Sequence, residues 1–259
     1  MANNKIEQEF QSRSERKAVR LNKFLSEAGI CSRRQADRLI ESGKVLVDGK
    51  RAECGMQIGP DQEVRVGNKM IQNKAKMVVL AVNKPSGIVC TEERRERNSI
   101  VRFLNYPERI TYVGRLDKDS EGLLLMTNNG DIINRMMRAG NCHEKEYKVT
   151  VDKAITEEFL EQMRSGVAIL DTVTRPCTVE QLGRYKFNII LTQGLNRQIR
   201  RMCEALGYQV TGLRRTRIMN IELGKLRNGE YREVTDEELN ILYDLIKSSS
   251  NKTVINKGE

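Results

Sequence analysis

Apolar positions near the start of the chain recur with helical spacing. In the segment VRLNKFLSEAG they lie three or four positions apart and stop at Gly29, which predicts a first short helix. Ser32 and Gln35 have the spacing of a capping box in front of a second amphipathic segment that ends at Gly43. This pattern predicts a second helix.

The polar face of the second predicted helix is strongly basic, and a strand pattern follows it. We expect three arginines to point outward from this face: Arg33, Arg34 and Arg38. The segment KVLVDGKRA predicts a hairpin around Asp48 and Gly49, and EVRV predicts a further strand. Residues 19–67 therefore predict a small folded unit of two helices and short strands.

The rest of the chain alternates between strand and helix patterns. A polar, basic segment at 68–76 predicts a linker, and the continuous apolar run in MVVLAVNKPSG predicts a strand buried on both faces. Strand patterns such as KEYKVTVDK and KFNIILTQG are interleaved with helix patterns such as TEEFLEQMRSG and NRQIRRMCEALG. Residues 77–247 therefore predict one α+β domain with a mixed sheet. The polar, aperiodic segments 1–18 and 248–259 predict mobile tails.

Composition limits the class of protein. The chain has 259 residues, of which 39% are hydrophobic and 31% charged. No apolar stretch approaches the roughly 20 residues that a membrane span needs, and the N-terminal segment lacks the apolar centre of a secretory signal. We therefore expect a cytoplasmic protein that does not interact with a membrane.

The residues that usually hold metals and cofactors are sparse. The six cysteines are at least 23 positions apart and there is one histidine, so no zinc-type or redox motif is present. The 19 glycines form no G-x-G and no G-x-x-x-x-G-K-[ST] pattern. We expect neither a metal nor a nucleotide cofactor.

Charge points to a polyanionic partner. The net charge is +10, and the segment 197–217 holds six arginines against the single acid Glu204. Guanidinium groups match phosphate oxygens in geometry, so nucleic acid is a natural partner. A solvated positive helix face explains the charge alone equally well.

The segment YVGRLDKDSEGLLLMTN places three acids beside an apolar strand pattern. They are Asp117, Asp119 and Glu121, and by residue type alone they are turn and cap formers. A glycosidase pair of carboxylates is disfavoured, because a chain with no tryptophan and 5% aromatic residues offers few rings to bind sugar. We expect His143 to be a hydrogen-bonded loop residue rather than a general base.

Four motifs, in the expected order, resemble those of the RsuA-like pseudouridine synthases. They are NKPSG at 83–87, GRLDKDSEGLLLMTNNGD beginning at Gly114, KEYKV at 145–149 and GLNRQIRRMCEALGY at 194–208. The segments RAGNCHEKEYKVTVDK and RTRIMN are most similar to the RluF branch of this family, and residues 20–66 resemble the S4-type RNA-binding domain. The resemblance implies a pseudouridine synthase fold, with a mixed, mainly antiparallel sheet and flanking helices, preceded by an S4-type domain.

The resemblance also implies roles for individual residues. Asp117 is the ionised carboxylate that acts on the nucleoside, by attack on the anomeric carbon, by addition to the base or by proton abstraction to give a glycal. Tyr147 offers a face for the base and a hydroxyl for proton transfer. Arg200, with Arg197 as the second choice, keeps Asp117 ionised, and Arg115 holds a phosphate or the space left by the flipped base. Further RNA contacts are expected from Lys84, Lys145 and Arg201, and from Arg33, Arg34 and Arg38 in the N-terminal unit.

The implied function is isomerisation of an extruded uridine in 23S rRNA, with a tRNA as a further candidate substrate, by a monomer that needs no cofactor. A non-catalytic RNA-binding or ribosome-assembly factor that keeps the fold is the competing hypothesis. The joint presence of Asp117, Tyr147 and Arg200 argues against it. An RNA methyltransferase with the same N-terminal module is disfavoured by the missing glycine-rich loop.

Overall fold

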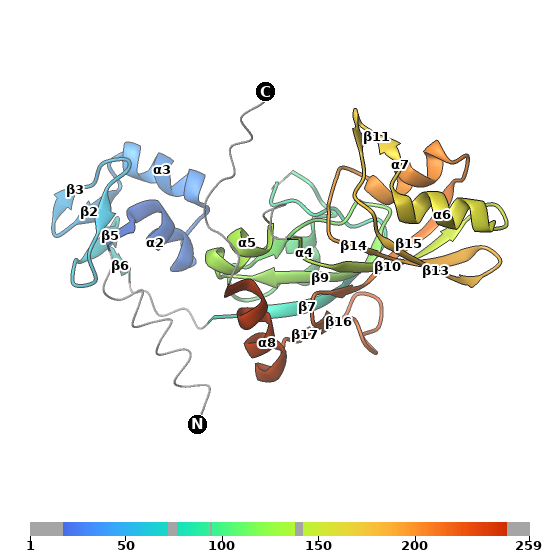
Figure 1. Cartoon of the computed structure of the whole chain (residues 1–259). Helices are drawn as coiled ribbons and strands as arrows, with labels where there is room; N and C mark the ends of the chain where they lie inside the picture. The colour runs from blue at the N-terminus through green and yellow to red at the C-terminus, as the bar shows by residue number, and fades with distance from the viewer. Residues whose placement is uncertain (1–17, 72–76, 94, 138–141, 248–259) are drawn as a thin grey trace. The chain divides into compact units, whose positions relative to one another are not determined.

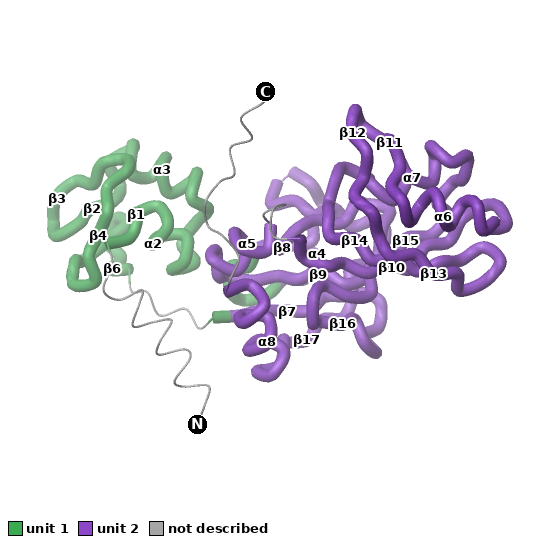
Figure 2. Tube along the Cα trace, in the orientation of Figure 1, with its two compact units in different colours: residues 1–77, 106–110 green, residues 78–105, 111–259 purple. Residues whose placement is uncertain are grey.

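The structure of the chain is a computed structural model that describes residues 18–71, 77–93, 95–137 and 142–247 (Figure 1). The tail expected at 248–259, the tail expected at 1–18 except for Ala18, and residues 72–76 of the expected linker lie outside the described residues. The chain divides into two compact units, Met1–Met77 with Tyr106–Ile110, and Val78–Asn105 with Thr111–Glu259 (Figure 2). In the described ranges, no helix is long and apolar enough to cross a membrane.

The N-terminal unit combines two helices with short strands. Its helices are α2 (Leu21–Glu27) and α3 (Arg33–Glu41). A four-stranded antiparallel sheet has the order β3 (Lys50–Arg51), β2 (Val45–Val47), β5 (Val64–Val66) and β6 (Lys69–Ile71), and β1 (Val19–Arg20) pairs with β4 (Gln57–Ile58). Leu21 and Leu25 of α2 pack with Ile40 of α3 and Val45 of β2 in one buried cluster.

Local signals explain these elements. The backbone N–H of Gln35 donates to the Ser32 hydroxyl at 3.3 Å, and the backbone N–H of Ser32 donates to the Gln35 side chain at 3.0 Å. This reciprocal pair confirms the predicted capping box. Asp48 and Gly49 both have positive φ, as a tight two-residue turn requires, and β2 and β3 flank them as the predicted hairpin.

One strand lies where the sequence predicts the start of a linker. Residues Lys69–Ile71 form β6, which pairs with β5, and the side chain of Ile71 is buried in the core of the unit. Gly67, with φ of 59°, turns the chain between the two strands. The segment is mostly polar, so its composition does not predict a strand, although Ile71 packs into the core.

The larger unit is built, in the part of the chain that the structure describes, on one nine-stranded sheet with the strand order β13-β14-β10-β15-β9-β7-β17. β8 pairs with β9 and β16 pairs with β15, and only the β15–β9 pairing is parallel. The strands are β7 (Val79–Lys84), β8 (Thr111–Val113), β9 (Glu121–Thr127), β10 (Lys145–Val151), β13 (Thr178–Gly183), β14 (Lys186–Leu191), β15 (Val210–Ile218), β16 (Ile221–Glu222) and β17 (Tyr231–Glu233). The predicted mixed, mainly antiparallel sheet is confirmed, and β7 is buried along its whole length.

Helices flank this sheet. They are α4 (Ile100–Leu104), α5 (Gly130–Met137), α6 (Glu157–Ser165), α7 (Gln198–Ala205) and α8 (Asp236–Lys247), and a small hairpin is formed by β11 (Ala168–Ile169) and β12 (Thr172–Val173). Figure 1 shows α6 and α7 close together beside β13 and β14. Phe159 of α6, Met202 of α7, Phe187 of β14 and Val149 of β10 belong to one buried cluster. Tyr147, two residues from Val149 on the same face of β10, borders this cluster.

The parallel strands β9 and β15 approach each other very closely at the centre of the sheet. Gly122 of β9 lies opposite Arg215 of β15. Gly122 has φ of 102°, and a Cβ atom added there would lie 2.2 Å from the Arg215 carbonyl oxygen. Only glycine satisfies both the backbone conformation and this gap, so Gly122 sets the spacing between the two halves of the sheet.

We predict that Gly122→Ala destabilises the protein by about 3 kcal/mol or more, because the new methyl group clashes with backbone and the φ value is unfavourable for alanine. Gly183→Ala is the matched control, since Gly183 also lies in a strand of this sheet but has open space around it. The control should change stability by about 1 kcal/mol at most. Equilibrium urea unfolding measures both, and equal midpoints for Gly122→Ala and wild type would contradict the account.

Candidate active site

The loop between β8 and β9 carries the aspartate that the sequence singles out. Asp117 opens a turn in which the Ser120 N–H donates to the Asp117 carbonyl at 3.1 Å. The carbonyl of the next residue, Lys118, accepts from the Gly87 N–H at 2.8 Å. The backbone at Asp117 is therefore held both by its own turn and by the loop after β7.

Lys84 supports this loop. Its buried ammonium group donates to the carbonyls of Pro85 at 2.7 Å, Ile88 at 2.8 Å and Lys118 at 3.4 Å. Burial lowers the pKa of Lys84. The sequence predicts Lys84 as a substrate-contacting residue, but it is not among the described residues that line the pocket, and its ammonium group binds backbone carbonyls next to Asp117.

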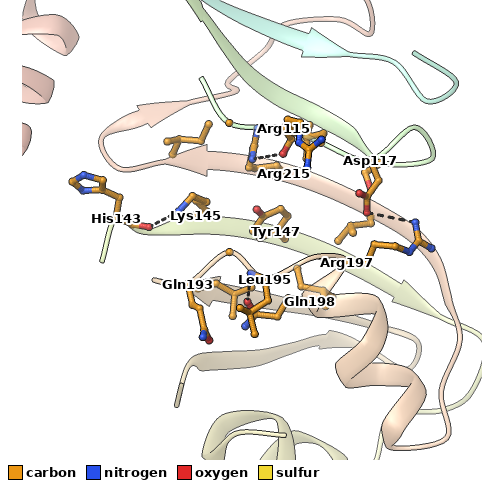
Figure 3. Close-up of a pocket in the computed structure, with 18 of the residues that line it drawn as sticks. Arg115, Asp117, His143, Lys145, Tyr147, Gln193, Leu195, Arg197, Gln198 and Arg215 are labelled. Atoms are coloured by element: carbon orange, nitrogen blue, oxygen red, sulfur yellow. Dashed lines mark hydrogen bonds and ion pairs between the residues drawn. The ribbon is translucent and has the colours of Figure 1, made fainter. Parts of the chain in front are cut away.

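A pocket with a volume of about 220 Å³ lies beside Asp117 (Figure 3). Its walls come from the β8–β9 loop, from β10 and β15, and from the segment that leads into α7. One carboxylate and four cationic side chains line it: Asp117, Arg115, Lys145, Arg197 and Arg215. Tyr147 lies among them in the close-up. The fold thus gathers residues from three of the four sequence motifs.

Asp117 forms an ion pair with Arg197. The distance from Asp117 Oδ2 to Arg197 Nη1 is 3.6 Å, and the two side chains are 33% and 43% exposed. Arg197 is the N-cap residue of α7 and has a left-handed backbone with φ of 50°. The turn before the helix is fixed because the Leu195 N–H donates to the Gln198 side chain at 3.0 Å. Arg197, the second choice of the sequence analysis, is therefore the arginine that meets Asp117.

Arg200, the first choice, has a different set of contacts. One turn into α7, its Nη1 donates to the Val210 carbonyl at 3.1 Å and its Nη2 donates to the Asp119 carbonyl at 3.3 Å. It therefore ties the β8–β9 loop to the start of β15. Arg201 donates to the Asn196 carbonyl at 3.2 Å and is not among the described residues that line the pocket.

Tyr147 and Arg215 lie opposite each other on adjacent strands. They are partners in the β10–β15 register, and the Arg215 Cζ is 6.0 Å from the centre of the Tyr147 ring. Arg215 is only 2% exposed, and its Nε donates to the Leu123 carbonyl at 2.7 Å. The sequence counts Arg215 in a basic segment but assigns it no site role. The available signal is strand alternation, which places Arg215 on the same inward face as the apolar residue Leu213.

Lys145 lies on the same face of β10 as Tyr147, two residues earlier. Its ammonium group donates to the His143 carbonyl at 2.9 Å. Burial, together with the nearby charge of Arg215, lowers the pKa of Lys145 to about 8. The His143 ring donates from Nε2 to the Arg135 carbonyl at 3.1 Å, which agrees with the expected hydrogen-bonded loop histidine. Burial lowers the pKa of His143.

The remaining predicted contacts lie on the N-terminal unit. Arg33, Arg34 and Arg38 are exposed on α3, as expected from the helical pattern. The described residues contain no group of three or more His, Cys, Asp or Glu side chains arranged to hold a metal ion. Two of the six cysteines, Cys54 and Cys142, are exposed.

Two family patterns match the chain. The pattern described as RNA pseudouridylate synthase covers residues 78–205, and the pattern described as S4 domain covers residues 19–64. The first match includes Asp117, Tyr147 and Arg197. The second includes all of α3.

Individual relatives agree with these matches. The chain is 54% identical over 237 residues to the dual-specificity RNA pseudouridine synthase RluF of Escherichia coli strain K12, covering 91% of this chain and 82% of the relative. It is 32% identical over 241 residues to the ribosomal large subunit pseudouridine synthase B of Bacillus subtilis strain 168, covering 90% and 98%. A crystal structure of a pseudouridylate synthase superimposes with a TM-score of 0.64 at 30% identity, covering 86% of this chain and 99% of that one.

Proposed function

Since the chain belongs to the RNA pseudouridylate synthase family, we propose that it converts a specific uridine of large-subunit 23S rRNA to pseudouridine, with a tRNA as a further candidate substrate. The family and the 54% identity to RluF make the chain an isomerase that forms pseudouridine in RNA. The names of two relatives support the substrates, since one is a dual-specificity enzyme and the other acts on the large ribosomal subunit.

The observation that carries the proposal is the Asp117–Arg197 ion pair in a pocket that also contains Tyr147. The reaction must break the bond between uracil and ribose, rotate the base while it is still held, and rejoin it through carbon 5. A carboxylate must be ionised to attack carbon or to take a proton. The Arg197 guanidinium group, 3.6 Å from Asp117, places a positive charge beside this carboxylate.

The pocket also suits an extruded nucleotide. A uridine inside an RNA stem is out of reach, so the enzyme must move it out of the stack and hold it on an aromatic or apolar surface. The Tyr147 ring offers this surface, and its hydroxyl is available for proton transfer. We propose that Arg115, which is exposed at the pocket, either contacts a flanking phosphate or fills the space that the flipped base leaves in the RNA.

We propose that Arg200 assists catalysis by position rather than by direct contact. Its two hydrogen bonds hold the backbone at Asp119, two residues after the catalytic carboxylate, against the start of β15. We propose that the protein acts as a monomer, since this chain supplies Asp117, Tyr147 and Arg197 to the pocket. We propose that the monomer acts in the cytoplasm, where its RNA substrates are made.

We propose that the N-terminal unit binds RNA through α3. Its exposed arginines Arg33, Arg34 and Arg38 offer forked donors for backbone phosphates. Such contacts give affinity and orientation without reading sequence, and they weaken as salt rises because bound counterions are released from the RNA.

Asp117→Asn removes the charge and keeps the shape of the side chain. We expect it to abolish pseudouridine formation on 23S rRNA and tRNA transcripts, detected by carbodiimide-based mapping, while RNA affinity stays within a few-fold. Asp119→Asn, an exposed aspartate in the same loop, is the control and should remain active. Undiminished product from Asp117→Asn would place the catalyst elsewhere. No product from the wild type on either RNA would favour a non-catalytic binding factor.

Arg34→Gln combined with Arg38→Gln should weaken RNA binding and reduce the slope of log affinity against log salt by about 1.5, since two phosphate contacts are lost. The control is Lys50→Gln with Lys69→Gln, which removes the same charge from strands of the same unit. Filter binding at several salt concentrations measures both. Equal slopes for the two double variants would rule out α3 as the phosphate-binding face.

A further inference from the structure

The cations in the pocket differ in depth. Arg115 and Arg197 are substantially exposed, whereas Arg215 is almost fully buried and Lys145 is half-buried. The phosphates of an RNA strand stay with the exposed backbone, so Arg115 and Arg197 can reach them. The two deeper cations lie beside Tyr147, where the base itself would be held.

Lys145 has no counter-ion among the residues that the structure describes. In the described part of the chain, its ammonium group has one hydrogen-bond acceptor, the His143 carbonyl, and no carboxylate within ion-pair distance. Arg215 is bound to the Leu123 carbonyl and has one contact at 3.5 Å with the Arg115 carbonyl, while its Nη2 has no acceptor among the described residues. One buried and one half-buried cation, with no carboxylate partner among the described residues, lower the stability of the fold because both lose hydration. Such a cost is typical of groups that face a ligand.

The chemistry of the reaction supplies a negative charge at this position. When the glycosidic bond breaks, its electron pair stays on the base. The sugar is completed by a bond from the Asp117 carboxylate to the anomeric carbon, or by loss of the neighbouring ribose proton to that carboxylate. If the carboxylate instead adds to the ring, the displaced electron pair moves onto a carbonyl oxygen as an enolate. All three routes move one negative charge from Asp117 to the carbonyl oxygens of the base.

We propose that Lys145, with Arg215 behind it, binds the carbonyl oxygens of the base and stabilises the negative charge that moves onto them. Lys145 keeps its proton and donates hydrogen bonds. Arg197 stabilises the charge while it is on Asp117, and the Lys145–Arg215 pair stabilises it after the transfer. This inference rests on the proposed function and adds a catalytic residue to it. Preorganised donors of this kind act most strongly in a pocket that excludes water.

Lys145→Met should lower kcat for pseudouridine formation at least 100-fold, with RNA affinity within a few-fold of wild type. Lys148→Met is the matched control and should be unchanged, because Lys148 is exposed on the opposite face of the same strand. Lys145→Arg keeps the charge and should recover part of the lost kcat. Wild-type kcat from Lys145→Met would overturn the proposal. A weaker affinity with unchanged kcat would also overturn it, since Lys145 would then be a phosphate contact.

The pH profile of the wild type gives a test that does not depend on how well a variant folds. Lys145 is charged below its pKa of about 8, so wild-type kcat/KM should fall as pH rises through that value. The groups around it are Arg215 on β15, Cys142 and His143 before β10, and Asp117 across the pocket.

Cys142→Ser replaces a side chain that interacts electrostatically with Lys145. It is the control and should keep the fall, whereas Lys145→Arg should lack it. Wild-type activity that stays level from pH 7 to 9.5 would contradict the proposal. The same assay separates a failure of the proposed function from a failure of the role proposed for Lys145. Absence of product from the wild type refutes the proposed function, whereas product with an unaffected Lys145→Met variant refutes only the role of Lys145.

Discussion

The close approach of β9 to β15 at Gly122 is the constraint on which the candidate active site depends. Asp117 lies in the loop that leads into β9, and Arg215 belongs to β15, which also pairs with the strand that carries Tyr147. A side chain at position 122 would separate the strands and move the Asp117 carboxylate away from Tyr147, Lys145 and Arg215. The absence of a Cβ atom at Gly122 therefore allows the β8–β9 loop and strands β10 and β15 to form one pocket.

The charged side chains of the pocket suit a reaction in which negative charge moves from Asp117 to the base. The pocket has one carboxylate, Asp117, which pairs with the exposed Arg197, and two less exposed cations, Lys145 and Arg215, that have no carboxylate partner among the described residues. An excess of buried positive charge lowers stability, because desolvation is only partly offset by hydrogen bonds to carbonyls. The large apolar cluster under α6 and α7 and the fully buried β7 supply the stability against which this cost is set.

Much of the local structure could be predicted from the sequence, because its causes are local. The capping box at Ser32 and the strand character of β7 follow from residues within a few positions of each other. Asp117 and Tyr147 were predicted from motifs, and the pocket contains both. Their roles remain predictions until activity is measured.

Longer-range features could not be predicted from the sequence. Arg197 and Arg200 lie three positions apart at the start of one helix, and the sequence cannot tell which guanidinium group reaches Asp117. In the structure it is Arg197, whose backbone is left-handed, that reaches Asp117. The pairing of Gly122 with Arg215 joins residues about ninety positions apart, so neither the tight contact nor the buried guanidinium group is visible in local patterns.

Single-turnover rates of Arg197→Gln and Arg200→Gln on the same rRNA transcript test whether Arg197 holds Asp117 in its catalytic state. We expect a loss of at least about 100-fold for Arg197→Gln with an unchanged unfolding midpoint. For Arg200→Gln we expect a smaller loss and a lower midpoint, because that variant loosens the loop between β8 and β9. A wild-type rate for Arg197→Gln, with activity abolished in a stably folded Arg200→Gln, would contradict this role of Arg197.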